Sequence, residues 1–237
     1  MQNTSVLWGE SIARVQAQYG KANRIASLNP QETALLVVDM QKFYLEPTST
    51  NFCPAALDII SNINALASAF RDVDAPVIWL RNIVGNKDIK SWSSFYERLT
   101  ETHLSYRRDK LAKDGDGFQL FPGMDVRSSD RKVNKTRFSA FSRDASNIEK
   151  VLGEYGTQVL VVCGIVTNVC VESTVRDAMM LNYEVLVVED ACASSNERAH
   201  EASINSMYTH FADVTLTSNV PRLLGPENSQ HLKASAA

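Results

Sequence analysis

The four cysteines of this 237-residue chain are its strongest candidate nucleophiles. No two of them form a Cys-x-x-Cys pair and no histidine-rich spacing accompanies them, which argues against a zinc site or a redox pair. Most free cysteines are small buried side chains. Cys163 and Cys192 fit that pattern because they fall in or just after apolar runs, and Cys53 has no assigned role. Cys170 is different because of its position relative to the apolar runs.

An acid, a base and a thiol each follow an apolar run of the sequence. Asp39 follows one such run, Lys135 ends a weaker one, and Cys170 comes a few residues after a third. In a parallel sheet the carboxyl ends of the strands meet at one edge, where ligands bind. If these runs are parallel strands, the three side chains converge at that edge. Other polar residues at the same strand ends are Gln41, Arg81, Asn82, Glu189 and Asp190.

The position of Cys170 predicts an activated thiol. It stands at the expected start of a helix that runs to Leu181, where free backbone N–H groups and the helix dipole stabilise a thiolate. A nearby lysine would lower the pKa of the thiol further, and an aspartate could take its proton. A cysteine–histidine pair is less favoured, because all four histidines fall away from these strand ends.

Each of the three residues also has a purely structural interpretation. Asp39 could cap the helix that follows it, Lys135 could lie in solvent, and Cys170 could be buried inside a helix. The joint placement of the three residues is what favours a catalytic site.

Strand-like and helix-like patterns alternate from residue 34 onward. The strand candidates are short, apolar runs of the kind found in parallel sheets covered on both faces, and they are residues 34–38, 77–80, 132–135, 159–163, 185–188 and 214–216. The helix candidates have apolar residues three to four positions apart, and they are residues 54–70, 145–155, 169–181 and 197–211. We therefore predict an α/β fold, with a mostly parallel six-stranded sheet in a three-layer α/β/α arrangement.

The chain divides into three predicted parts. Residues 1–28 form an N-terminal amphipathic helical extension, residues 29–225 form one domain, and residues 226–237 form a flexible tail. The extension could pack on its own domain or on a second subunit. Within the domain, residues 85–121 are a long aromatic connection that could carry substrate contacts or form a surface helix with a few anchoring rings.

Composition excludes several classes of partner. The chain has 24 Lys and Arg against 27 Asp and Glu and a net charge of −3, which argues against nucleic-acid binding. It has no run of about 18 apolar residues that would span a membrane. The N-terminus has no secretory pattern. Unpaired cysteines in such a chain favour a reducing compartment, and we expect a cytoplasmic protein.

Three segments of the chain together resemble the isochorismatase-like cysteine hydrolases. They are Thr33-Ala-Leu-Leu-Val-Val-Asp39-Met-Gln41, Lys135-Thr-Arg-Phe-Ser-Ala-Phe141 and Gly164-Ile-Val-Thr-Asn-Val-Cys170-Val-Glu-Ser-Thr-Val-Arg-Asp-Ala178. They occur in the family's order and at suitable spacing, and the resemblance extends from about Thr33 to Thr217. It implies a six-stranded parallel sheet with Rossmann-like strand order and helices on both faces. It also implies a homo-oligomer of two or four subunits.

The resemblance assigns roles to the converging residues. Asp39 would be the base, Lys135 its electrostatic partner and Cys170 the nucleophile. A cis peptide bond before Val166 would let the N–H groups of Val166 and Cys170 form an oxyanion hole. Candidate contacts to a small-molecule substrate, in falling order, are Asn82, Gln41, Arg81, Tyr44, Trp92 and Phe138.

The reaction implied is hydrolysis of a non-peptide C–N bond in a small amide, carbamoyl or ureido substrate through a thioester. Family members that cleave the vinyl ether of isochorismate lack the cysteine, so Cys170 favours amide hydrolysis. Nicotinamidases have an Asp-x-His metal site in the first half of the chain, whereas no histidine precedes His103 here, so we expect no metal and no cofactor.

The amidohydrolase branch that acts on ureidoacrylate is the most similar. The similarity lies in Trp79-Leu-Arg-Asn82 and in the segment from Cys170 to Asp177, although Ile83-Val84 departs from that branch. Two alternatives stay open. One is a vinyl ether hydrolase that uses Asp39 as a general acid, and the other is a non-enzymatic thiol sensor or scaffold.

Overall fold

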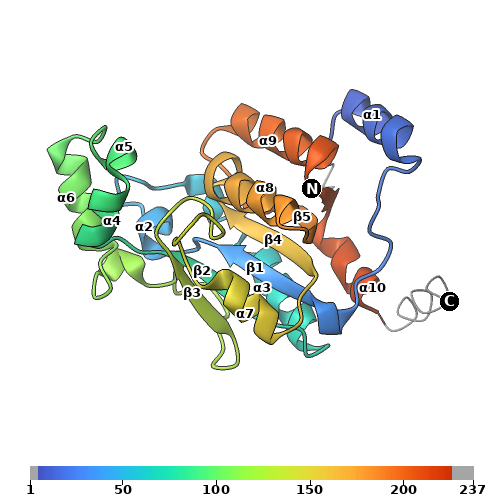
Figure 1. The fold of residues 1–237 in the computed structure, drawn as a ribbon, viewed down its shortest axis with the longest axis horizontal. Coiled ribbons are helices and arrows are strands. Elements are labelled where there is room, and N and C mark those ends of the chain that lie inside the picture. The colour runs from blue at the N-terminus through green and yellow to red at the C-terminus, as the bar shows by residue number, and fades with distance from the viewer. Residues whose placement is uncertain (1–4, 226–237) are drawn as a thin grey trace.

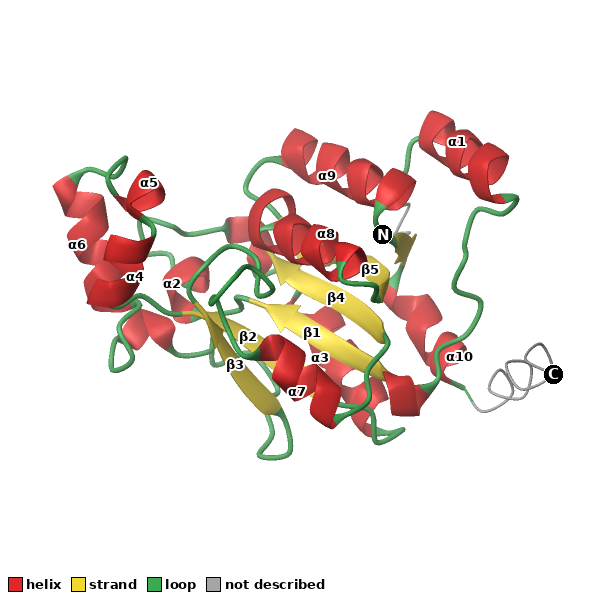
Figure 2. Cartoon of the chain, in the orientation of Figure 1, coloured by secondary structure: helices red, strands yellow, loops and turns green. Residues whose placement is uncertain are grey.

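Six strands form one parallel sheet at the centre of the molecule (Figures 1 and 2). The computed structural model describes residues 5–225. The strands are β1 (Thr33–Val38), β2 (Val77–Asn82), β3 (Arg131–Lys135), β4 (Val159–Ile165), β5 (Glu184–Ala193) and β6 (Asp213–Thr215). They pair in the order β3-β2-β1-β4-β5-β6, and every neighbouring pair is parallel. The predicted fold class is confirmed.

Helices cover both faces of the sheet. They are α1 (Gly9–Tyr19), α2 (Lys42–Leu45), α3 (Ile60–Arg71), α4 (Asn86–Ser91), α5 (Ser93–Tyr96), α6 (Glu101–Lys110), α7 (Ile148–Glu154), α8 (Glu172–Met180), α9 (Glu197–His210) and α10 (Val220–Leu224). In Figure 1, α7 and α8 lie in front of the sheet and α3 lies behind it. None of the helices within residues 5–225 combines the length and the apolar character needed to cross a bilayer.

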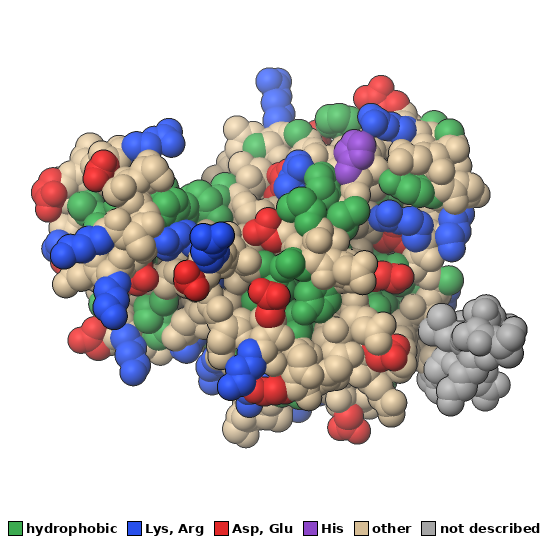
Figure 3. Space-filling model, in the orientation of Figure 1, with side chains coloured by type: hydrophobic (Ala, Val, Ile, Leu, Met, Phe, Trp, Pro, Cys, Tyr) green, Lys and Arg blue, Asp and Glu red, His purple; other side chains and the backbone are tan. Residues whose placement is uncertain are grey.

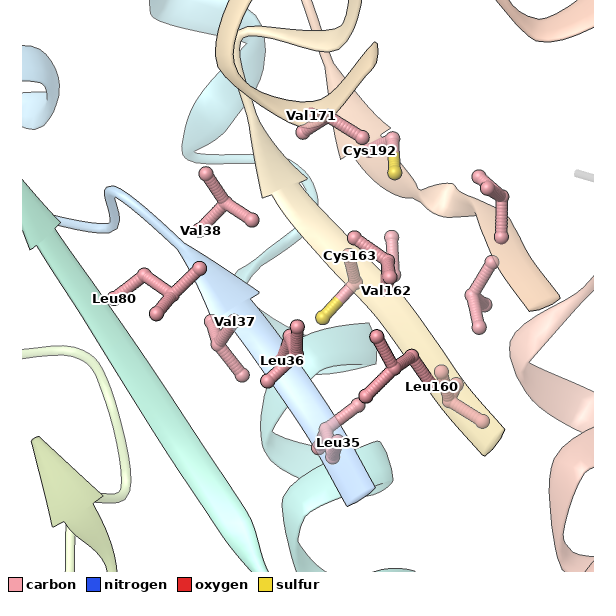
Figure 4. Packing of buried hydrophobic residues seen from close by; sticks show 14 of the residues in the cluster. Leu35, Leu36, Val37, Val38, Leu80, Leu160, Val162, Cys163, Val171 and Cys192 are labelled. Atoms are coloured by element: carbon pink, nitrogen blue, oxygen red, sulfur yellow. The ribbon is translucent and has the colours of Figure 1, made fainter. Parts of the chain in front are cut away.

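The core is built where β1 and β4 lie side by side. Every residue of both strands except Val159 is buried, as expected of central strands with helices on both faces. Figure 4 shows side chains of β1 next to those of β4, with Cys163 among them. On the other side, α3 buries Ile63, Leu66 and Phe70, which stand three or four positions apart and therefore share one helix face.

β5 is longer than the run 185–188 predicts. Val187 pairs with Val162, and the next pairs along the strand join Cys192 to Gly164, so the register shifts between them. Glu189 and Asp190 were expected beyond the strand end but lie inside β5. The prediction failed because hydropathy marks only the strand's apolar part, whereas the backbone pairing continues past the two acidic residues.

The N-terminal extension packs on its own domain. Helix α1 lies within the predicted segment 1–28, and it contacts α9. Asn205 of α9 accepts a hydrogen bond from the Trp8 amide at 2.8 Å and donates one to the Val6 carbonyl at 3.0 Å. The predicted tail, residues 226–237, lies outside the described residues.

The long connection between β2 and β3 folds into a helical lobe. Helices α4, α5 and α6 form this lobe beyond the carboxyl ends of β1 and β2, and it projects from the body in Figures 1 and 3. On the face drawn in Figure 3, acidic and basic side chains are interspersed. The lobe is thus positioned to form a wall at the edge of the sheet where the candidate residues converge.

Candidate active site

Asp39 and Lys135 form a buried ion pair at the carboxyl edge of the sheet. Asp39 follows β1 and Lys135 ends β3, so the lysine side chain reaches past the end of β2. Lys135 Nζ lies 2.7 Å from Asp39 Oδ2, and the two side chains are 0% and 1% exposed. Burial is the largest single influence on the pKa of Lys135 and lowers it. The charge and hydrogen bond of Asp39, together with Cys170 and Tyr44, outweigh burial, so the pKa is raised overall. The lysine therefore stays protonated.

Gln41 fixes the loop that carries Asp39. Its side-chain amide donates to the carbonyl oxygens of Asn82 at 2.9 Å and Phe118 at 3.0 Å, and its side-chain oxygen accepts from the Asn82 amide at 2.6 Å. These bonds join the end of β1 to the end of β2. Asp39 adopts a left-handed backbone conformation with φ 54°, which aspartate tolerates better than most residues.

Cys170, the candidate nucleophile, stands on a short π-helical turn between β4 and α8, Thr167–Val171, which we call the nucleophile turn. The peptide bond between Ile165 and Val166 is cis, as the family resemblance implies. Helix α9 holds the turn, because Ser203 Oγ donates to the Thr167 carbonyl at 3.3 Å and Thr167 Oγ1 lies 2.9 Å from a ring nitrogen of His200.

The thiol of Cys170 is not the low-pKa thiol that its position predicts. Cys170 is 5% exposed, and burial raises the pKa of its thiol to about 12. The charge of Lys135 lowers this pKa by less than burial raises it, and the charge of Asp39 raises it further. The expectation of a stabilised thiolate was wrong because it left out desolvation, which favours the neutral thiol. A thiol in this state needs a base.

Asp39 offers the acceptor that such a thiol requires. Its Oδ2 is bound to Lys135, while Oδ1 is buried and has no hydrogen-bond partner among residues 5–225. The carboxylate is close enough to Cys170 to raise the pKa of the thiol. The buried cluster thus contains a carboxylate with a free oxygen, a cation and a protonated thiol, a set that could carry out nucleophilic catalysis.

A pocket of about 300 Å³ opens beside Cys170. Its lining comes from the nucleophile turn, the lobe and the loops after β1 and β3, and consists of Tyr44, Asn51, Phe95, Leu99, His103, Arg107, Phe138, Val166, Val169 and Cys170. Within the described part of the chain, no group of three or more His, Cys, Asp and Glu side chains is placed to hold a metal ion.

Two of the predicted substrate contacts, Tyr44 and Phe138, line the pocket. Trp92 lies behind its wall, with its ring centroid 4.5 Å from that of Phe95 and 4.8 Å from that of Phe138.

The other three predicted contacts lie outside the lining. Gln41 and Asn82 are joined to each other as described above. Arg81 stacks its guanidinium 4.3 Å from the ring centroid of Phe118 and donates to Asn134 on β3 at 2.9 Å.

Arg107 is the pocket residue that the sequence gives least reason to expect. It stands in the run Arg107-Arg108-Asp109-Lys110, which has the appearance of a solvated helix end. The available signal is its spacing, because Leu104 and Leu111 lie three before and four after it and share its helix face.

Comparisons with known proteins place the chain in a family. Residues 33–219 match the model of the isochorismatase domain. A ureidoacrylate amidohydrolase RutB from Klebsiella pneumoniae subsp. pneumoniae is 30% identical over 214 residues, which cover 84% of this chain and 90% of the relative.

Solved structures give the same placement. A cysteine hydrolase from Pseudomonas syringae pv. phaseolicola has a TM-score of 0.76 at 29% identity, covering 84% of this chain and 94% of that one. N-carbamoylsarcosine amidase from Thermoplasma acidophilum shares the fold, with a TM-score of 0.63 at 23% identity over 78% of this chain and 96% of that one. Since the domain match spans most of the sequence, the chain is a member of the isochorismatase family of hydrolases.

Proposed function

We propose that this chain hydrolyses the C–N bond of a small amide, carbamoyl or ureido compound through a thioester on Cys170. The observation that carries the proposal is the buried group of Asp39, Lys135 and Cys170, in which Cys170 also lines a small pocket. The names of the relatives, a ureidoacrylate amidohydrolase and a cysteine hydrolase, agree with this chemistry.

The reaction begins with a proton transfer. Asp39 Oδ1 takes the proton of the Cys170 thiol as the sulfur attacks the substrate carbonyl carbon. Because burial raises the pKa of the thiol, the sulfur needs an acceptor for its proton in order to attack. Lys135 remains bound to Oδ2 and balances the negative charge that the thiol–carboxylate pair carries throughout.

Collapse of the tetrahedral intermediate completes the first half. The N–H groups of Val166 and Cys170 hold the oxyanion. Asp39, now protonated, gives its proton to the departing nitrogen, so ammonia or an amine leaves as the C–N bond breaks. A water molecule then loses a proton to Asp39 and attacks the thioester, and the thiolate that departs recovers the proton from Asp39.

A panel of small amides and ureides tests the proposal by release of ammonia. We expect turnover of at least one of them, and we expect the Cys170→Ala variant to lose nearly all of it while keeping its circular dichroism spectrum. Cys163→Ala is the matched control, since it removes a buried thiol of the β4 core and should leave turnover unchanged. Wild-type turnover in Cys170→Ala would contradict the proposal.

Mass spectrometry separates this mechanism from its rival within the family. Rapid acid quenching during turnover should trap an acyl group on the peptide that contains Cys170. A vinyl ether hydrolase that uses Asp39 as a general acid would give no adduct and would not need the cysteine.

A further inference from the structure

We infer that Arg137 sets the width of the pocket beside Cys170 by fastening the helical lobe to the loop after β3, and so limits the size of the substrates that reach the thiol. The inference rests on the proposed function for the reaction at Cys170, and it adds a residue that determines specificity. The evidence is a guanidinium whose contacts join two walls of the pocket. Arg137 is not among the lining residues, so its role is one of positioning.

The guanidinium of Arg137 binds the lobe and its own loop at the same time. Its Nη2 donates to the Ser91 carbonyl at 3.1 Å and to Ser91 Oγ at 3.0 Å. Ser91 is the last residue of α4, and carbonyl groups at a helix end are suited to bind a basic side chain. On the side of the loop, Nη1 donates to the Thr136 carbonyl at 3.1 Å. One nitrogen thus holds the lobe while the other holds the loop.

The same guanidinium stacks on the aromatic group that supports the pocket wall. It lies 5.1 Å from the ring centroid of Trp92, within the range of a cation–π contact. Trp92 in turn stacks on Phe95 and meets Phe138 edge to face. Phe95 belongs to the lobe, Phe138 follows Arg137 in the loop, and both rings line the pocket. Arg137 therefore fixes the ring that stands behind both of them.

The contacts of Arg137 depend on the shape of its side chain. Its partners are two carbonyl groups, hydroxyl groups and an indole ring, and no ion pair joins it to an acidic side chain in the described part of the chain. Such partners require several N–H groups in one plane and a flat face that stacks. Lysine has the same charge but offers neither.

The backbone of Arg137 contacts the buried ion pair separately. Lys135 Nζ donates to the Arg137 carbonyl at 3.2 Å, in addition to its bond with Asp39. This contact uses the main chain, so it does not require the guanidinium. A change of the Arg137 side chain therefore acts first on the attachment of the lobe. Without the guanidinium, the ring contacts alone would hold Phe95 against Phe138, and we expect the pocket to widen.

A pair of uncharged ureas tests the inference. Ethylurea and 2-phenylethylurea share the reacting group and differ by a phenyl ring. In Arg137→Met, kcat/KM for ethylurea should fall, mainly through KM, because a wider pocket holds a small substrate less closely. The ratio of kcat/KM for 2-phenylethylurea to that for ethylurea should rise about fivefold or more. An equal change for both ureas would mean that Arg137 acts on the thiol or on the whole fold, and would overturn the inference.

Three further variants separate geometry from charge. Arg137→Lys should give nearly the same ratio as Arg137→Met, and full recovery of the wild-type ratio would contradict the proposed geometry. Ser91→Ala keeps the carbonyl acceptor, so it should raise the ratio less than Arg137→Met does. Arg131→Met removes an exposed arginine of β3 that pairs with Glu154 at 2.9 Å, and it should leave the ratio unchanged. The same rise in Arg131→Met would overturn the inference.

Hydrogen exchange gives a readout that does not depend on turnover. In Arg137→Met, peptides that cover residues 86–96 should exchange about fivefold faster or more, while peptides of β4 should keep their wild-type rates. Unchanged exchange in residues 86–96 would overturn the inference, and so would an equal acceleration in β4. Faster exchange confined to residues 86–96, with no hydrolysis of any urea or amide, would keep Arg137 as the attachment of the lobe and reject the proposed reaction instead.

Discussion

Asp39 and Lys135 are charged side chains removed from solvent, and each is the main compensation for the burial of the other. The Lys135 ammonium and the Asp39 carboxylate lie 2.7 Å apart, and the two side chains are 0% and 1% exposed. Removal of either side chain would therefore leave the other as a buried charge without a partner. The cost of that charge is usually larger than the net contribution of the intact pair.

A double-mutant cycle on this pair should therefore be strongly non-additive. We expect Asp39→Asn and Lys135→Met each to lower the free energy of unfolding by about 3–5 kcal/mol, and the double variant to lose clearly less than the sum. Urea denaturation measures all four proteins, with Lys132→Met, at an exposed position of the same strand, as a control. Additive losses would mean that the two charges are compensated separately.

The protonation state of Cys170 can be read from its alkylation. In the folded protein the pKa of the Cys170 thiol is about 12, whereas an unfolded cysteine has a pKa near 8.5. Folded Cys170 therefore keeps its proton at a pH where an unfolded cysteine loses it. The rate of iodoacetamide reaction at Cys170, followed by peptide mass spectrometry, should rise about tenfold per pH unit from pH 7 to pH 10. A plateau below pH 9 would show a thiolate that the surroundings already stabilise.

The same raised pKa has a consequence for stability. Above the ordinary thiol pKa the unfolded chain loses the proton of Cys170 while the folded protein keeps it. The free energy of unfolding is therefore unaffected by this thiol at lower pH and falls as the pH rises above that value.

At the scale of elements, the site depends on how closely β4 approaches β1. Gly164 has φ +110°, and a Cβ added there would lie 2.3 Å from the Val38 carbonyl oxygen and 2.6 Å from its nitrogen. The residues on either side of this contact lead directly to Asp39 and to the nucleophile turn. Only glycine lets the two strand ends meet.

Gly164→Ala should consequently be among the most damaging single changes in the chain. We expect a loss of about 4 kcal/mol or more in the free energy of unfolding, because backbone atoms of β1 would have to move. Gly153→Ala on α7 is the matched control, since a Cβ there meets nothing within 4 Å, and it should be neutral or stabilising by about 1 kcal/mol. Similar chemical denaturation curves for the two variants would contradict the expected clash.

The elements also explain how far the sequence alone could lead. Apolar runs mark the strands, and polar residues that follow them mark the functional edge, so Asp39, Lys135 and Cys170 could be predicted from local patterns. Gln41 and Asn82 stand at the same edge but bind each other, because the ends of β1 and β2 need a link that no local pattern reveals.

The pocket wall illustrates the other limit. Its lobe residues come from a polar stretch whose hydropathy does not indicate which side chains point inward. Arg107 is buried because α6 packs against Phe43 and Tyr44 of α2 and Phe95 of α5. The burial that raises the pKa of Cys170 likewise arises from elements far away in the sequence. Such facts depend on packing between elements and not on the residues next to each position.

At the scale of the whole molecule, the N-terminal extension supports the site from outside. Residues before β1 run along α9, where the Tyr208 hydroxyl donates to the Ala22 carbonyl at 2.7 Å and Asn205 holds the backbone near Trp8. Helix α9 in turn holds the nucleophile turn through Ser203 and His200. The chain thus connects its first helix to Cys170 through one intermediate element.

Removal of residues 1–20 should weaken this connection. We expect the thermal midpoint to fall by roughly 5 °C, which corresponds to about 2 kcal/mol for a domain of this size. Scanning calorimetry measures the shift, and light scattering on the same samples gives the number of subunits before and after truncation. An unchanged midpoint would mean that α1 adds no stability, and a change in mass would mean that it also contacts another subunit.

The aromatic group behind the pocket gives the molecule its own optical probe. The chain has three tryptophans. Trp79 is fully buried and Trp8 is 43% exposed. Trp92 stacks on Phe95 and meets Phe138 edge to face, and both of these rings line the pocket. Indole emission responds to shifts of neighbouring groups, so a ligand that displaces either ring should change the fluorescence of Trp92 alone. Affinities for unreactive compounds then become measurable without any assay of turnover, and Trp92→Phe supplies the blank.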